Sequence, residues 1–134
     1  MKEQIRKLQN DFINLNPHDE DEKYNGNNIL IIKAISYISE NFNTDISLDS
    51  IADMVFISPH YFSELFKKTI GIGFNEYIKK MRMEKASELL SQPEFKVKEI
   101  SSMVGYNDVS YFIRVFNKHY NMSPSIYRLN ILGK

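Results

Sequence analysis

The chain has 134 residues, no cysteine, and 17 basic against 17 acidic side chains, so its formal net charge is zero. This length suits one compact domain or two small lobes sharing a helix, and the lack of cysteine excludes disulfides, thiolate metal sites and a cysteine nucleophile. The longest early apolar run, residues 29–32, is far too short for a signal-peptide core or a membrane span. We therefore expect a cytoplasmic protein with no membrane partner.

Residues 1–28 are predicted to form an N-terminal connector helix followed by a polar linker. Ile5, Leu8, Phe12 and Leu15 are spaced three, four and three residues apart, which is the stripe of a helix that packs on a partner. Two interpretations stay open. The stripe is either the tail of a coiled connector from an upstream sensory or receiver domain, through which a homodimer would form, or a short helix folded onto this domain's own surface.

The linker is expected at residues 18–28, which are polar throughout except for Tyr24 and Gly26. Its clustered carboxylates at 19–22 lack the alternating ligands and the distal glutamate of a calcium loop. A solvated linker is therefore the prediction, and the folded domain is expected to occupy residues 29–134.

A first helix-turn-helix is predicted at about residues 29–72. Apolar positions at helical spacing mark one helix through Ile38 and a second through Ile51. Ser58 followed by Pro59 indicates the start of a third helix, since a serine oxygen accepts from free first-turn amides and proline at the first position costs no hydrogen bond. Gly71, which tolerates positive φ, ends that helix.

A linker helix is predicted at about residues 73–91, with Pro93 just beyond its end. About 18 residues at about 1.5 Å each span about 27 Å, which approaches the roughly 34 Å between successive major grooves on one face of a duplex. We expect this helix to space two DNA-reading units so that both meet the same side of the duplex, with some bending of the DNA.

The second helix-turn-helix, at about residues 96–132, repeats the first. Tyr61-Phe62 and Phe66 recur fifty residues later as Tyr111-Phe112 and Phe116, with one residue inserted at the turn. Asp108 takes the place of Ser58 as the helix start, and Asn121 takes the place of Gly71 as its end. The fold class is therefore predicted to be all-α, with two helix-turn-helix subdomains joined by a long linker helix.

The charge is distributed unevenly along the chain. Residues 1–28 hold four Lys/Arg against six Asp/Glu, residues 29–55 hold one against four, and residues 56–134 hold twelve against seven. The last segment is thus basic within a neutral chain, which fits a nucleic-acid surface that does not bind phosphate indiscriminately.

From about Ile29 to Leu132 the chain resembles the DNA-binding domain of the AraC/XylS family of bacterial transcription regulators. The resemblance rests on residues 51–77 and on Val97 to Ile100, Val104-Gly105-Tyr106, Tyr111-Phe112, Arg114-Val115-Phe116, Ser123-Pro124 and Tyr127-Arg128. The sequence departs from the family at Asn121, where glycine is common, and at Glu64, where many relatives carry a basic or amide side chain. The resemblance implies double-stranded DNA as ligand and RNA polymerase as a candidate partner, and relatives commonly attach a ligand-binding or phosphate-accepting domain.

Site residues follow from the helical faces and from the resemblance together. In the first recognition helix, 58–70, the expected base-reading residues are His60, Ser63 and Glu64, where Glu64 could accept from a cytosine amino group. In the second, 108–120, they are Val109, Ser110, Ile113 and Arg114, where Arg114 could bracket the two acceptors of a guanine. The phosphate candidates are Lys67, Lys68, Lys79, Lys80, Arg82, Lys118 and Arg128.

Less specific interpretations apply to some of these positions. Tyr61 and Tyr111 border the buried faces, so we expect them to be wedged against their own domain, and Arg82 is alternatively a structural ion-pair partner. His60 and His119 lie in different copies, and no metal is predicted. No cofactor pocket is expected either.

Two other functional classes are alternatives to DNA binding. The alternative function is a helical protein-interaction module that retains the fold without reading DNA, which salt-sensitive DNA binding would separate from the main interpretation. An enzyme is not predicted, because the sequence holds no glycine-rich phosphate loop and no convergent set of histidines and carboxylates at catalytic spacing.

Overall fold

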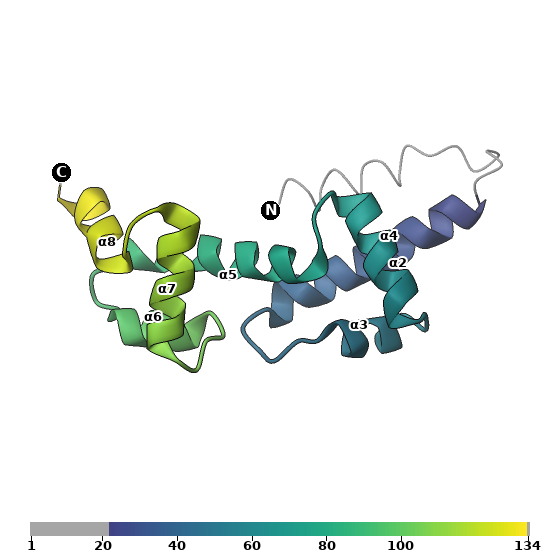
Figure 1. Ribbon diagram of the computed structural model, residues 1–134, viewed down its shortest axis with the longest axis horizontal. Helices are drawn as coiled ribbons and strands as arrows, with labels where there is room; N and C mark the ends of the chain where they lie inside the picture. The colour runs from purple at the N-terminus through teal and green to yellow at the C-terminus, as the bar shows by residue number, and fades with distance from the viewer. Residues whose placement is uncertain (1–21, 134) are drawn as a thin grey trace. The chain divides into compact units, whose positions relative to one another are not determined.

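The computed structural model describes residues 22–133, which form seven helices (Figure 1). Their bounds are α2 Glu22–Asn41, α3 Leu48–Met54, α4 Pro59–Ile70, α5 Phe74–Leu90, α6 Val97–Met103, α7 Val109–Tyr120 and α8 Pro124–Leu132. Within the described range no residue is assigned to a strand, and none of the helices there is both long and apolar enough to cross a membrane. The all-α prediction is confirmed. The apolar stripe at residues 5–15 lies outside the described residues.

The first described helix begins earlier than the sequence suggested. Residues 22–28 were expected to be polar linker, but they form the start of α2, so that part of the prediction is wrong. Once the apolar stripe nucleates a helix, adding a turn costs little because each further residue gains a backbone hydrogen bond. Asn28 is only 5% exposed. The buried part of α2 therefore begins before Ile29, where the folded domain was expected to start.

The structure divides into two compact units, and the first comprises the described residues up to Asn41 together with Ile46–Ile78. Here α4 packs against both α2 and α3. Phe62 and Phe66 on α4 are fully buried, and their rings meet the ring of Phe74 at 5.9 and 5.8 Å between centroids. The apolar stripe of α2, at Ile31, Ala34, Ile35 and Ile38, is fully buried.

The second unit comprises Phe42–Asp45 and the residues from Lys79 onwards. Its core is built from α5, α6 and α7, and α7 packs on both α6 and α8. The ring of Phe116, fully buried at the centre, lies 5.9 Å from that of Phe112, 4.7 Å from that of Tyr120 and 5.4 Å from that of Tyr127. The repeated motif thus forms an aromatic core in each unit.

Helices α4 and α7 begin and end where the sequence predicted. The Ser58 side chain accepts a hydrogen bond from the Tyr61 amide, and the Asp108 carboxylate accepts from the amides of Ser110 and Tyr111. Gly71 at φ 97° and Asn121 at φ 60° end the helices, and each donates its amide to the carbonyl four residues earlier. These contacts satisfy amides and carbonyls that a helix end leaves without a partner.

The turns before α4 and α7 differ in one respect. Phe56 and Gly105 occupy equivalent positions, and both have positive φ, 61° and 104°. The Phe56 side chain is 93% exposed. At Gly105, in contrast, an added Cβ would lie 3.1 Å from the Asn43 Cα and 3.2 Å from the Arg82 guanidinium. The second turn is therefore closely packed, whereas the first carries its aromatic ring in solvent.

Candidate nucleic-acid interface

The outward face of α7 carries the predicted base-reading residues of the second copy. Ser110, Ile113 and Arg114 are exposed, and Val109 is half-buried beside them. Phe112 and Phe116, on the opposite face, anchor α7 in the core. This division follows from the helical repeat, since residues three and four apart share one face. A polar and partly apolar strip is thereby left open to a ligand.

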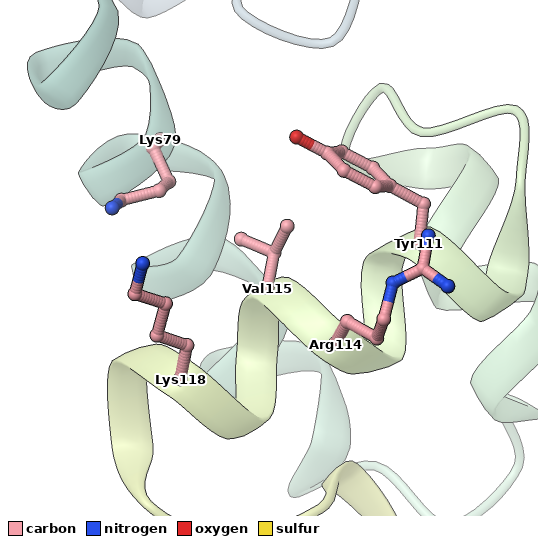
Figure 2. Close-up of a pocket in the computed structure, with 5 residues that line it drawn as sticks. All are labelled: Lys79, Tyr111, Arg114, Val115 and Lys118. Atoms are coloured by element: carbon pink, nitrogen blue, oxygen red, sulfur yellow. The ribbon is translucent and has the colours of Figure 1, made fainter.

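Three cationic side chains surround a hollow in the second unit (Figure 2). The hollow has a volume of about 260 Å³ and is lined by Lys79 from α5 and by Tyr111, Arg114, Val115 and Lys118 from α7. None of these five lining residues is acidic. Figure 2 shows the Lys79 and Lys118 ammonium ends turned toward one another across the hollow. Like charges so arranged attract an anion, and a phosphate group fits this chemistry.

The equivalent face of α4 in the first unit has a different electrostatic character. The Nε2 atom of His60 lies 3.2 Å from the Oε1 atom of Glu64, one helical turn away. Both side chains are strongly exposed, 86% and 68%, so the pair adds little stability. Ser63, half-buried, lies on the same helix. His60 and Glu64 are both predicted base-reading residues, but the sequence does not predict that they pair with each other.

The lysines expected to contact phosphate lie on several elements. Lys67 and Lys68 are exposed in the last turn of α4, and Lys118 is exposed in the last turn of α7. Positive charge there also offsets the negative end of the helix dipole. Lys79 and Lys80 are half-buried on α5, and only Lys79 of the two lines the hollow.

Arg82 makes contacts inside the fold. Its Nε donates to the Phe42 carbonyl at 2.8 Å, and one of its terminal nitrogens donates to the Thr44 carbonyl at 3.0 Å. Its guanidinium carbon also lies 5.1 Å from the ring centroid of Tyr106. Burial raises the pKa of Tyr106 above its ordinary value of 10, with the Arg82 charge acting in the opposite direction. The phenol is therefore neutral at physiological pH, and the contact is between a cation and a ring face.

Arg128 makes similar contacts in the loop before α6. Its Nε donates to the Leu90 carbonyl at 3.0 Å, and a terminal nitrogen donates to the carbonyls of Gln92 and Phe95 at 3.2 and 2.6 Å. The phosphate interpretation of Arg82 and Arg128 is weakened by these contacts, because an arginine bound to carbonyls must break those bonds to reach DNA. Arg82 thus holds the loop before α3, and Arg128 holds the loop before α6.

These contacts lead to a prediction that separates structural from phosphate arginines. Replacing Arg82 by methionine should lower the free energy of unfolding by about 1.5–3 kcal/mol, because two charge-assisted hydrogen bonds are lost. The slope of log affinity for DNA against log salt should stay unchanged. Lys118→Met should leave stability within about 0.5 kcal/mol and reduce that slope by about 1. The same reduction in slope for Arg82→Met would restore its phosphate role.

Some contacts of this interface could not be read from the sequence. Tyr111 was expected to be wedged in its own domain, but its side chain is 50% exposed, and Tyr61 is 42% exposed. The guanidinium carbon of Arg114 lies 5.7 Å from the ring centroid of Tyr111. The sequence did contain one indication of this contact, because residues three positions apart on a helix have neighbouring side chains.

Comparison with known protein families identifies a helix-turn-helix domain model that matches residues 51–130. Among characterised proteins, the regulatory protein PocR of Salmonella typhimurium is 38% identical over 115 residues, which cover 86% of this chain. The chain spans about a third of that relative, 35% of its length.

Solved structures agree with this match. The C-terminal domain of AraT, a response regulator from Geobacillus stearothermophilus, superposes with a TM-score of 0.73 at 38% identity, covering 75% of this chain and 84% of that one. The DNA-binding domain of AdpA, solved in complex with a target DNA, gives a TM-score of 0.71 at 18% identity, covering 75% and 90%. The second likeness concerns the fold alone.

Proposed function

The chain belongs to the AraC/XylS family of helix-turn-helix transcription regulators, and from this premise we propose that it reads a specific double-stranded DNA sequence with α4 and α7. The observation that carries the proposal is the exposed face of α7, which presents Ile113 and Arg114, and on which Arg114 lines a hollow together with Lys79 and Lys118. Base readout requires exposed polar and apolar side chains on a helix, and phosphate binding requires cations beside them. Both requirements meet on this helix.

The proposal assigns different roles to side chains of α7. Arg114 donates two hydrogen bonds to the acceptors of a guanine in the major groove, Ser110 contacts a neighbouring base, and Val109 and Ile113 touch thymine methyl groups. Lys118 and Lys79 hold a backbone phosphate at the hollow. In α4, His60, Ser63 and Glu64 contact bases, and Lys67 and Lys68 contact phosphates. Lys80 is a further phosphate contact.

The two recognition helices would enter successive major grooves of one duplex. The internal repeat supports this proposal, because two copies of one reading unit are expected to bind in the same manner. The 17 residues of α5 correspond to a helix of about 26 Å, against roughly 34 Å between grooves on one face. The charge of Glu64 makes the first unit the weaker binder, since its carboxylate repels phosphate.

Two partners are proposed on the same premise. RNA polymerase is one, because transcription regulation requires communication with that enzyme. A second copy of the chain is the other, with dimerisation through residues 1–28 or through an upstream domain of a longer protein. Equilibrium sedimentation with and without residues 1–21 tests the second partner, since only a dimer that depends on those residues agrees with the connector interpretation.

The experiment that tests the proposed function is selection of randomised duplex DNA by the purified chain at two salt concentrations. Recovery of two short boxes about one helical turn apart is the expected result. A single recovered box would restrict reading to one helix. No enrichment and no salt-dependent retention would instead favour a protein-interaction module.

Arg114→Ala provides a sharper test on the selected duplex. We expect a loss of about 1–3 kcal/mol of binding free energy and relaxed preference at one base pair. Lys67→Ala is the control, which should weaken binding to all duplexes alike because phosphates carry no sequence information. The measurement is fluorescence anisotropy with a panel of single-base variants. An equal loss on every duplex for Arg114→Ala would show that this side chain contacts phosphate only.

A further inference from the structure

We propose that Tyr111 is a positioning residue for sequence readout, because its ring holds the Arg114 guanidinium in the orientation used to contact a base. This inference rests on the proposed function and adds a specificity residue to it. The Arg114 guanidinium carbon lies 5.7 Å from the Tyr111 ring centroid, within the range where a cation is attracted to a ring face. The two residues are three positions apart on α7, so their side chains are neighbours.

The ring of Tyr111 is itself held in place. Its centroid lies 5.9 Å from that of Tyr106, at an interplanar angle of 52°, and Tyr106 is only 8% exposed. Tyr106 in turn lies beneath Arg82, which is bound to two carbonyls. A half-exposed ring supported by a buried ring and a fixed arginine is a firm surface for a mobile side chain.

The charges around the hollow act in the same direction. Lys79 and Lys118 line the hollow with Arg114, and no acidic residue is among the side chains lining it. Repulsion from two ammonium groups disfavours a guanidinium turned into the hollow. Figure 2 shows the Arg114 guanidinium on the Tyr111 side, away from both lysine ends. Attraction to the ring and repulsion from the lysines thus favour one orientation.

The first copy of the repeat lacks this arrangement. Tyr61 is the equivalent of Tyr111, but the equivalent of Arg114 is Glu64. A carboxylate is not attracted to the negative face of an aromatic ring, and Glu64 instead lies 3.2 Å from His60. The tyrosine is therefore present in both units, whereas the residue three positions after it is a cation in the second unit and a carboxylate in the first. This difference supplies a matched control within the same chain.

An arginine already oriented in the free protein loses less side-chain entropy when it binds. A planar guanidinium makes two parallel hydrogen bonds to guanine only in a narrow range of orientations. Ordering a long side chain on binding costs affinity, and prior ordering reduces that cost. The Tyr111 ring lowers the entropy that Arg114 loses when it binds its base. Because this gain depends on the base that Arg114 contacts, it raises sequence preference more than general affinity for DNA.

The test compares Tyr111→Leu, Tyr111→Phe and Tyr61→Leu on the selected duplex and on the duplex changed at the Arg114-dependent base pair. Tyr111→Leu should reduce discrimination between the two duplexes about two- to fivefold, the size expected of an exposed cation–ring contact. Tyr111→Phe should keep the discrimination, since the ring face remains. Tyr61→Leu should leave it unchanged. A thermal melt of each variant verifies folding.

A double variant isolates the mechanism. In the Arg114→Ala background, Tyr111→Leu should cause no further loss of discrimination, because the side chain to be positioned is absent. A further loss there, or equal losses for Tyr111→Phe and Tyr111→Leu, overturns the positioning role while the proposed function stands. A parent chain with no preference between any duplexes overturns the proposed function itself, and the role of Tyr111 with it. The two failures are therefore distinguishable.

Discussion

Phe116→Ala should lower the free energy of unfolding of the second unit by about 3–5 kcal/mol. Phe116 is fully buried, and its ring packs against those of Phe112, Tyr120 and Tyr127. Removing it costs the transfer free energy of the ring and leaves a cavity that its rigid aromatic neighbours cannot fill. A small unit has little stability to lose, so its helices should unfold well below the parent's melting temperature.

The measurement is urea denaturation combined with amide hydrogen exchange, which resolves the two units. Protection should be lost in α6 and α7 before it is lost in α4. Phe66→Ala is the matched variant in the first unit, also fully buried, and should reverse that order. Phe56→Ala, at a 93% exposed side chain, should change stability by less than about 0.5 kcal/mol. An unchanged transition for Phe116→Ala would refute its place in the core.

Gly105→Ala should destabilise the second unit by about 2–5 kcal/mol. Two costs combine at this turn. The backbone has φ 104°, which a residue with a Cβ adopts at a cost of about 1–2 kcal/mol. The new Cβ would also lie 3.1 Å from the Asn43 Cα, and relieving such crowding costs about 1–3 kcal/mol. Arg82 would have to move as well, so its hydrogen bonds to the Phe42 and Thr44 carbonyls should weaken.

The same turn in the first unit provides the control. Phe56 has φ 61° and an exposed ring, so Phe56→Gly relieves backbone strain without removing packing. We expect up to about 1 kcal/mol of stabilisation, since the greater freedom of glycine in the unfolded chain offsets part of the gain. Both variants are compared by thermal unfolding monitored by circular dichroism. A harmless Gly105→Ala substitution would falsify the close packing of the second turn.

Helix boundaries were the part of the fold most accessible to sequence reasoning. The capping roles of Ser58 and Asp108, and the positive φ of Gly71 and Asn121, were predicted from residue type and were confirmed. These features are local, because a cap joins atoms within four residues of one another. The start of α2 was placed too late, since the polar composition of residues 22–28 concealed a helix continuing from the stripe at Ile31.

The candidate site was harder to predict from the sequence than the helix boundaries were. Periodicity separated the buried face of α7 from its open face, which placed Ser110, Ile113 and Arg114 outward. It did not show that Arg114 lies against Tyr111 or that Lys79 joins Lys118 at one hollow. Lys79 and Lys118 are 39 positions apart, and no local pattern connects residues at that separation.

The sequence by itself determined the repeat, the two helix-turn-helix units, the ends of α4 and α7 and the basic character of residues 56–134. Each of these features depends on residue type, on the spacing of residues a few positions apart, or on the internal repeat of the sequence. Only the tertiary structure decided which cations remain available to a ligand. The sequence shows three equivalent cations at Arg82, Arg128 and Lys118. In the structure both arginines donate to carbonyls 33 to 40 positions away, whereas Lys118 lines an open hollow. The reason is that a side chain's partners depend on which distant backbone atoms the fold brings within hydrogen-bonding distance.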